Sequence, residues 1–240
     1  MSVVVNAPNL PNTPSPLSAP DSTPFEAIPD MVAQWAKKQP QRRALLCEGR
    51  AVSWGEFGSA VDRIANALLA MGFKPGDKAA VLAYPSIEYV QTFFGILRAG
   101  GCVVPLSTMA GADQLKLMIE DADSRVFFLG AGMRELAAPF ADRIEGLLPN
   151  GRVAFDFSAS GWQDFETWKK SGKDEAPGVP VDSEMAFNLI YSSGTTGVPK
   201  GILHNHGLRW FLIKRWEGMG FAPDTISIVS TPLYSNTTPV

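Results

Sequence analysis

Residues 78–106, KAAVLAYPSIEYVQTFFGILRAGGCVVPL, contain the clearest structural pattern in the chain. They begin with the apolar run 79–84 and end with a second apolar run, 102–106, each of the length of a β-strand. A segment of helix length, 87–99, separates the two runs. Near-continuous apolar strands joined by a helix are typical of a parallel sheet that is covered on both faces. The pattern therefore predicts parallel strands with a crossover helix.

The same alternation continues toward the C-terminus. Short apolar runs recur at 125–129 and 153–155, and segments of helix length lie at 113–121 and 135–148. Before residue 78, we expect a helix from Ile28, a hairpin of strands 44–47 and 51–54, and a helix in which Ser53 and Glu56 form a capping box. The chain thus predicts an α/β fold with a parallel sheet and helices on both faces.

Composition suggests four parts. Residues 1–24 contain six prolines and neither Lys nor Arg, so we expect a disordered tail. Residues 25–168 would form a first α/β subdomain, and the polar segment 169–184 a linker. Residues 185–240 would begin a second subdomain, with a strand at 185–191, a loop leading to a helix that bears Leu208 and Trp216, and a strand at 225–230.

Charge and cysteine content exclude several classes of partner. The net charge of -3 argues against nucleic acid, and no apolar run reaches the roughly 18 residues of a membrane span. Cys47 and Cys102 are read as buried apolar residues rather than a disulfide or zinc site. No targeting signal is recognised, so a cytoplasmic location is expected. The oligomeric state is not indicated.

The chemistry is concentrated in residues 191–201, YSSGTTGVPKG. Glycines allow a backbone to approach a ligand closely, hydroxyls donate to phosphate oxygens, and a lysine ammonium supplies charge. A solvated turn is the ordinary alternative. The usual G-x-x-x-x-G-K-[ST] spacing does not fit, because Pro199 precedes the lysine and Gly201 follows it. The predicted phosphate-binding residues are Ser192, Ser193, Gly194, Thr195, Thr196, Gly197 and Lys200.

This loop resembles the phosphate-loop signature of the adenylate-forming (AMP-binding) superfamily. Residues 52–57 (VSWGEF), 97–106 (LRAGGCVVPL) and 232–234 (PLY) resemble further segments of that family, in the same order. The resemblance implies an AMP-forming acyl-CoA synthetase that uses ATP, Mg²⁺ and coenzyme A to activate a carboxylic acid. It also implies that Lys200 is catalytic. The matching segments correspond only to the N-terminal part of such an enzyme.

The resemblance further implies an acyl pocket beside Tyr234, Ser235, Asn236 and Thr237. Ser235 stands where the family often has histidine, so the acid could carry a second polar group. A plain alkyl pocket is the alternative. Because the family's adenine, ribose and metal segments lie beyond residue 240, we expect the chain alone to be inactive. The rival interpretations are an amino-acid-activating adenylation domain of a peptide synthetase and a non-catalytic nucleotide-binding module.

His204 and His206 would point the same way on a strand, but no Cys, Asp or Glu lies nearby in sequence to complete a metal site. No metal ligands are therefore assigned. His206 is expected to pack or form a hydrogen bond beside the phosphate loop, or to cap the next helix.

Overall fold

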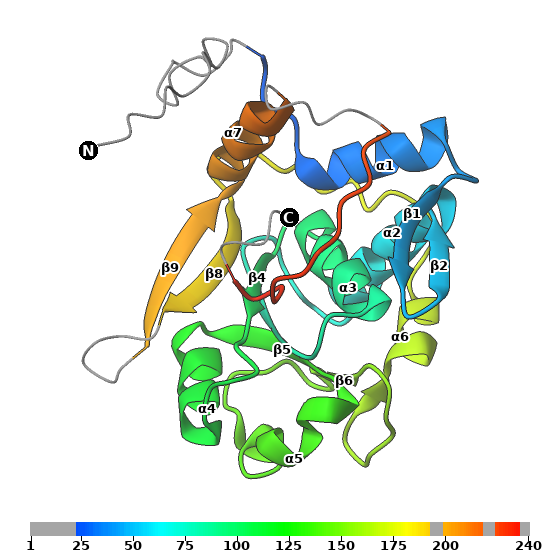
Figure 1. Ribbon diagram of the computed structural model, residues 1–240. Helices are drawn as coiled ribbons and strands as arrows, with labels where there is room; N and C mark the ends of the chain where they lie inside the picture. The colour runs from blue at the N-terminus through cyan, green and yellow to red at the C-terminus, as the bar shows by residue number, and fades with distance from the viewer. Residues whose placement is uncertain (1–22, 193–198, 218–223, 236–240) are drawn as a thin grey trace, which may run out of the picture.

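The protein is described by a computed structural model over residues 23–192, 199–217 and 224–235. Its centre is a seven-stranded sheet in the order β7-β6-β5-β3-β4-β8-β9 (Figure 1). Each neighbouring pair is parallel except β8 and β9, which are antiparallel. The strands are β3 (Lys78–Leu82), β4 (Cys102–Pro105), β5 (Ser124–Leu129), β6 (Arg152–Ala154), β7 (Gln163–Asp164), β8 (Ala186–Ser192) and β9 (Lys200–Asn205).

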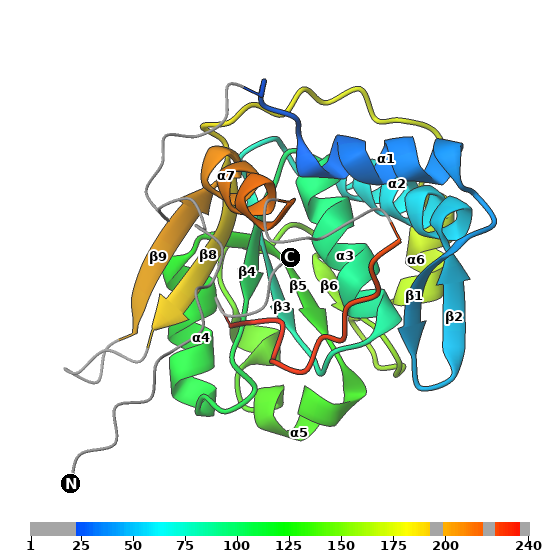
Figure 2. The ribbon, with the colours of Figure 1, turned by 45° about the horizontal axis from the view of Figure 1, so that its top comes forward.

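Helices cover both faces of this sheet (Figure 2). Alternate residues of β3 face opposite sides: Ala79 and Val81 pack on one core, and Ala80 and Leu82 on the other. The first core receives α1 (Ile28–Lys38), α2 (Trp54–Ala70), α3 (Ile87–Arg98) and α6 (Phe165–Ser171). The second receives α4 (Ala112–Asp121) and α5 (Arg134–Ala137). The predicted α/β fold class is confirmed. None of the helices in the described ranges has the length and apolar character needed to cross a membrane.

Local signals before β3 are confirmed. Strands β1 (Arg43–Cys47) and β2 (Arg50–Ser53) form the expected antiparallel hairpin. At its end, Ser53 accepts a hydrogen bond from the Glu56 backbone N–H, and the Glu56 carboxylate accepts one from the Ser53 N–H. This capping box begins α2 one residue after β2 ends.

The predicted helix at 135–148 is wrong. Only α5 and the short 3-10 turns Ala131–Met133 and Ala141–Arg143 occupy this region. Pro139 has no N–H to continue the helical hydrogen bonds of α5, and Gly146 has a left-handed φ of 82° that ends any regular helix.

The predicted course after β8 also needs correction. The chain does not pass from the loop into a helix: it returns as β9, whose Ile202 pairs with Ile190 of β8, and α7 (His206–Glu217) follows. A hairpin needs only a short connecting loop, so bringing β8 and β9 together costs little conformational entropy of the chain. Residues 225–230 are not a strand in the described structure, and Ile226 and Ile228 are 85% and 90% exposed.

The segment expected to be a linker packs on α2. The Asn66 amide donates to the carbonyls of Lys173 and Glu175, and the Arg63 guanidinium donates to the carbonyl of Gly172. β8 then joins the first sheet, with Asn188 opposite Val103 of β4. The domain boundaries at 168 and 184 stay predictions, but the strands on both sides of this segment share one sheet.

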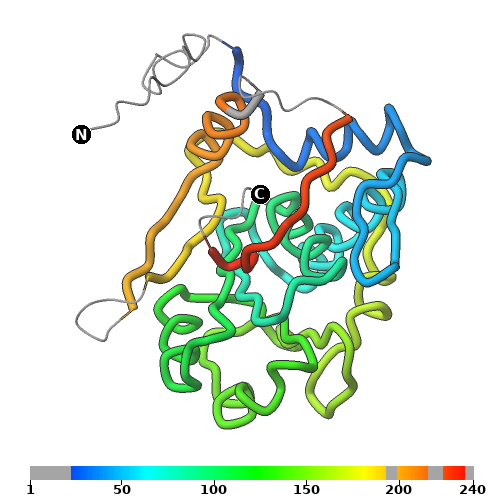
Figure 3. The backbone as a smooth tube through the Cα atoms, in the orientation of Figure 1, coloured from blue at the N-terminus to red at the C-terminus, as the bar shows by residue number. Residues whose placement is uncertain are grey.

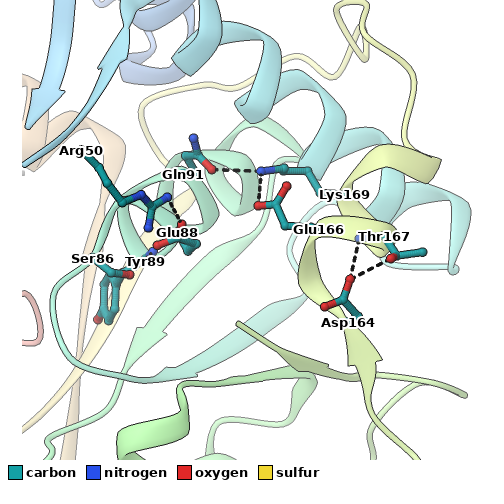
Figure 4. A network of polar contacts seen from close by, with 9 residues as sticks. All are labelled: Arg50, Ser86, Glu88, Tyr89, Gln91, Asp164, Glu166, Thr167 and Lys169. Atoms are coloured by element: carbon teal, nitrogen blue, oxygen red, sulfur yellow. Dashed lines mark hydrogen bonds and ion pairs between the residues drawn. The ribbon is translucent and has the colours of Figure 1, made fainter. Parts of the chain in front are cut away.

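A polar network holds the β1–β2 hairpin, α3 and α6 together (Figure 4). Arg50 of β2 pairs with Glu88 of α3 at 2.5 Å. The Lys169 ammonium of α6 donates to Gln91 of α3 at 3.4 Å and pairs with Glu166 at 2.7 Å. Asp164 caps α6 by accepting from the Thr167 backbone N–H. These contacts fix the first turn of α3 against its neighbours.

Candidate functional site

The carboxyl ends of β3, β4 and β8 lie at one edge of the sheet, because the three strands are parallel. The chain leaves β3 for α3 on one face and leaves β4 for α4 on the other. The edge between β3 and β4 is therefore a topological switch point, where open α/β sheets bind their ligands. The last described segment, residues 224–235, crosses this end of the molecule (Figure 3).

Two of the predicted phosphate-binding residues, Ser192 and Lys200, flank the Ser/Thr/Gly segment 193–197 and lie within the described structure. Ser192 ends β8 and Lys200 begins β9, and the two are opposite each other across the strand pair. The Ser192 hydroxyl lies 3.5 Å from the Lys200 carbonyl oxygen, a long contact that leaves the hydroxyl available to a ligand. Both residues are exposed. Ser193, Gly194, Thr195, Thr196 and Gly197 lie outside the described residues.

The charge of Lys200 has no ion-pair partner within residues 23–192, 199–217 and 224–235. An exposed ammonium and a nearby hydroxyl on the two strands that bound a Ser/Thr/Gly loop suit a polyphosphate. The chemistry of Ser192 and Lys200 is therefore compatible with phosphate oxygens, and binding of the ATP triphosphate by this loop stays a prediction. No group of three His, Cys, Asp or Glu side chains that could hold a metal ion is found in these ranges.

Tyr191 anchors the start of the loop. Its hydroxyl donates to a carboxylate oxygen of Asp121 at 2.5 Å, which ties the end of β8 to the end of α4. Burial and the neighbouring Asp121 carboxylate raise the pKa of the Tyr191 phenol above its ordinary value. The hydroxyl therefore stays protonated and keeps donating. Sequence reasoning did not find this contact.

A pocket of about 270 Å³ opens at the switch point. It joins the residues after β3, the first turn of α3, a residue after β4 and the last described segment. The predicted acyl-pocket residue Tyr234 lines it, and Ser235 follows directly, with its N–H bonded to the Pro232 carbonyl. Asn236 and Thr237 lie outside the described residues. The lining residues are Ala83, Tyr84, Pro85, Tyr89, Thr108 and 229–234.

The two histidines do not share a strand. His204 lies on β9, where its Nδ1 is 3.1 Å from the Asn188 side-chain oxygen, and Arg209 of α7 donates to the same oxygen at 3.2 Å. Burial, with Arg209 adding to it, lowers the pKa of His204. His206 instead begins α7. The argument that both side chains point the same way required both residues to lie on one strand, and β9 ends at Asn205, between them.

His206 is buried against the Phe187 ring, with ring centroids 5.0 Å apart in an edge-to-face arrangement. Neither of its ring nitrogens has a hydrogen-bond partner in the part of the chain that the structure describes. Burial lowers its pKa to about 4, against an opposing effect of Asp182. His206 is therefore a neutral packing residue at the start of α7. Its N–H bonds to the Met185 carbonyl, so it lies at the end of the β8–β9 hairpin opposite Ser192 and Lys200, and not beside the predicted phosphate loop as the sequence suggested.

We expect the His206→Phe variant to lose part of the acid sensitivity of the wild type. In the unfolded chain His206 takes up a proton near pH 6.5, whereas the folded chain resists it until about pH 4. Its contribution to stability is thus complete above pH 6.5 and lost as the pH falls toward 4, at up to about 1.4 kcal/mol per pH unit. Urea unfolding at pH 7.5, 6 and 5 measures this slope. If the free energy of unfolding changed with pH equally in the variant and the wild type, the burial of a neutral His206 ring would be contradicted.

A family model for AMP-binding enzymes matches residues 32–237. The chain belongs to the AMP-binding enzyme family. The matched range includes residues 191–201 and the pocket segment 229–234.

Relatives of the chain carry ligase and synthase names. It is 32% identical over 174 residues to the fatty acid–[acyl-carrier-protein] ligase ScoC of Streptomyces coeruleorubidus, which covers 71% of this chain and 31% of that protein. It is 29% identical over 200 residues to a feruloyl-CoA synthase of Amycolatopsis sp, which covers 83% of this chain and 38% of that protein. The chain therefore spans about a third of the length of these curated relatives.

A solved structure confirms the fold. The crystal structure of the anthranilate CoA ligase AuaEII in complex with anthranoyl-AMP matches with a TM-score of 0.72 at 24% identity, over 77% of this chain and 36% of that one. At this identity the likeness is one of fold. It agrees with the mostly parallel sheet and its helices.

Proposed function

We propose that this chain is the N-terminal part of an AMP-forming acyl-CoA synthetase. The observation that carries the proposal is the pairing of Ser192 and Lys200 around the Ser/Thr/Gly loop, at the sheet edge where the pocket beside Tyr234 also opens. Ser192 and Lys200 at this edge suit a polyphosphate, and the pocket beside Tyr234 suits a small organic acid. The names of the relatives, which include CoA and carrier-protein ligases, support the same reaction class.

In this reaction a carboxylate attacks the α-phosphate of ATP, which releases pyrophosphate and forms an acyl-AMP. The carboxylate is already a nucleophile, so the site needs no side-chain base; it needs positioning and stabilisation of the charge on the pyrophosphate. Lys200 would supply the positive charge and Ser192 a donor to a phosphate oxygen. Mg²⁺ would share the neutralisation of phosphate charge. Tyr191, held by Asp121, would keep the loop's first strand in place.

The thiol of coenzyme A would then displace AMP and give a thioester. A carrier-protein thiol, as in the name of ScoC, is the alternative acceptor, and an amino acid the alternative acid. Because the reaction consumes ATP and CoA, we infer a cytoplasmic location. A non-catalytic module would bind ATP without releasing AMP.

The test uses a full-length form of the protein, extended to the length of its relatives. With Mg-ATP, a mixture of carboxylic acids and CoA, we expect release of AMP and pyrophosphate together with an acyl-CoA, identified by mass spectrometry. Replacing CoA by a carrier protein, and the acids by amino acids, separates the alternatives. Release of ADP and phosphate, or no acid-dependent turnover with any acceptor, would overturn the proposal.

A further inference from the structure

The β8–β9 hairpin projects beyond the end of its neighbour in the sheet. β8 is registered with β4 through one residue pair, Val103 opposite Asn188, and β4 ends two residues later at Pro105, which has no N–H to donate. Ser192 lies four residues past Asn188, about 13 Å farther along an extended strand. The outer end of the hairpin, residues 190–192 and 200–202, therefore has no backbone hydrogen bond to β4 in the described structure.

One side-chain hydrogen bond joins this outer end to the rest of the protein, among the residues that the structure describes. The Tyr191 hydroxyl donates to Asp121 Oδ2 at 2.5 Å, the length of a strong bond to a carboxylate. Leu189 and the Tyr191 ring also pack on the second core, but apolar contact has no preferred direction. The hydrogen bond therefore supplies the directional restraint on the outer end of the hairpin.

Asp121 is a firm anchor, because its helix is fixed by burial. It is the last residue of α4, and Leu115 and Ile119 of that helix are fully buried in the second core. The outer end of β8 lies beside α4 in both ribbon views (Figures 1 and 2). Gly201 of β9 is opposite Tyr191, and a Cβ atom there would lie 3.3 Å from the Tyr191 ring. The ring thus lies across both strands, so its hydroxyl ties the pair to α4.

We propose that the hydrogen bond between Tyr191 and Asp121 is a latch that holds Ser192 and Lys200 in position for pyrophosphate, with Tyr191 as a positioning residue. The inference rests on the proposed function, because it concerns the same polyphosphate site. With the latch formed, both donors are in place before the ligand arrives. Without it, binding must also order the outer end of the hairpin, which lowers the affinity.

The experiment measures pyrophosphate binding to the 240-residue chain by isothermal titration calorimetry, at a temperature where circular dichroism shows every variant to be folded. Tyr191→Phe removes only the hydroxyl, and we expect it to bind pyrophosphate about fivefold more weakly, the equivalent of one ordinary hydrogen bond. In the Asp121→Ala background the hydroxyl has lost its acceptor. There the same substitution should change the dissociation constant by less than about twofold.

Asp123→Asn is the matched control. It removes a carboxylate charge two residues from Asp121 but leaves the bond between Asp121 and Tyr191, and asparagine tolerates the left-handed φ of 51° at this position. In this background Tyr191→Phe should keep its fivefold effect.

Equal affinity of the wild type and Tyr191→Phe would overturn the inference, even if the variant melted at a lower temperature, because the bond would then serve stability alone. An effect of Tyr191→Phe that is the same with and without Asp121 would also overturn it. Failure of the proposed function would appear differently: the wild type itself would not bind pyrophosphate, and the inference would fall with the site.

Discussion

Lys200→Ala is expected to slow acid-dependent ATP–pyrophosphate exchange by roughly ten- to over a hundredfold in a full-length form of the protein. A hydrogen bond to a charged phosphate contributes about 1.5–3 kcal/mol, and 1.4 kcal/mol corresponds to a factor of ten. Lys200 is exposed at the start of β9 and has no ion pair in the described ranges, so the substitution removes charge without breaking a structural contact. Thermal unfolding should therefore stay unchanged.

The control for this effect is Lys37→Ala. Lys37 is also exposed, but it lies in the last turn of α1, away from the sheet edge. Its loss should leave exchange unaltered. If Lys200→Ala exchanged pyrophosphate at the wild-type rate, the loop would not be the polyphosphate site that we propose.

Gly172→Ala is expected to lower the free energy of unfolding by about 3 kcal/mol, the upper part of the usual range for overpacking. A Cβ atom at this position would lie 1.9 Å from the Arg63 carbonyl oxygen and 2.9 Å from the Ala67 backbone nitrogen. Both atoms belong to the backbone of α2, which cannot rotate aside as a side chain could. The Arg63 guanidinium also donates to the Gly172 carbonyl at 3.0 Å, so the two segments cannot separate without losing that bond.

Urea unfolding of this variant should be compared with that of Gly111→Ala. Gly111 precedes α4 with a φ of -72°, and no heavy atom lies within 4 Å of the Cβ that alanine would add. Because Gly111 is the N-cap of α4, where alanine is less favourable than glycine, that variant should lose about 1 kcal/mol at most, well below the loss expected for Gly172→Ala. Equal stability of Gly172→Ala and the wild type would mean that residues 172–175 do not pack on α2 as described.

Sequence patterns predicted the parts of this fold that depend on local order. The apolar strands around Ala80, Val104 and Phe127 are buried on both faces, and burial of this kind leaves a continuous apolar run. The capping box at Ser53 was predictable because both of its partners lie within four residues. By contrast, the missed strand β9 is held by pairing with β8, and its six residues begin with Lys and Gly, which are poor strand formers.

The candidate site likewise has features that the local sequence predicted and contacts that it did not. The candidate phosphate loop stood out in the sequence because its glycines, hydroxyls and lysine lie together within residues 192–200, and its role stays a prediction. The Tyr191–Asp121 hydrogen bond joins residues 70 positions apart, and no local pattern announces it. The position of Tyr89 beside residues 229–234 likewise depends on how the chain crosses the sheet edge. Such contacts follow from topology, which spacing along the sequence does not reveal.

The most direct test of the central claim, that the hairpin of β8 and β9 grips the pyrophosphate part of ATP, is a titration of the ¹⁵N-labelled 240-residue chain with pyrophosphate, followed by NMR. We predict that the amide signals of Ser192, Lys200 and Gly201 shift in a saturable manner. AMP, which lacks the β- and γ-phosphates, should shift them far less at the same concentration, and Lys200→Ala should weaken the response to pyrophosphate. Unmoved signals at these three residues, or equal shifts with AMP and pyrophosphate, would contradict the account.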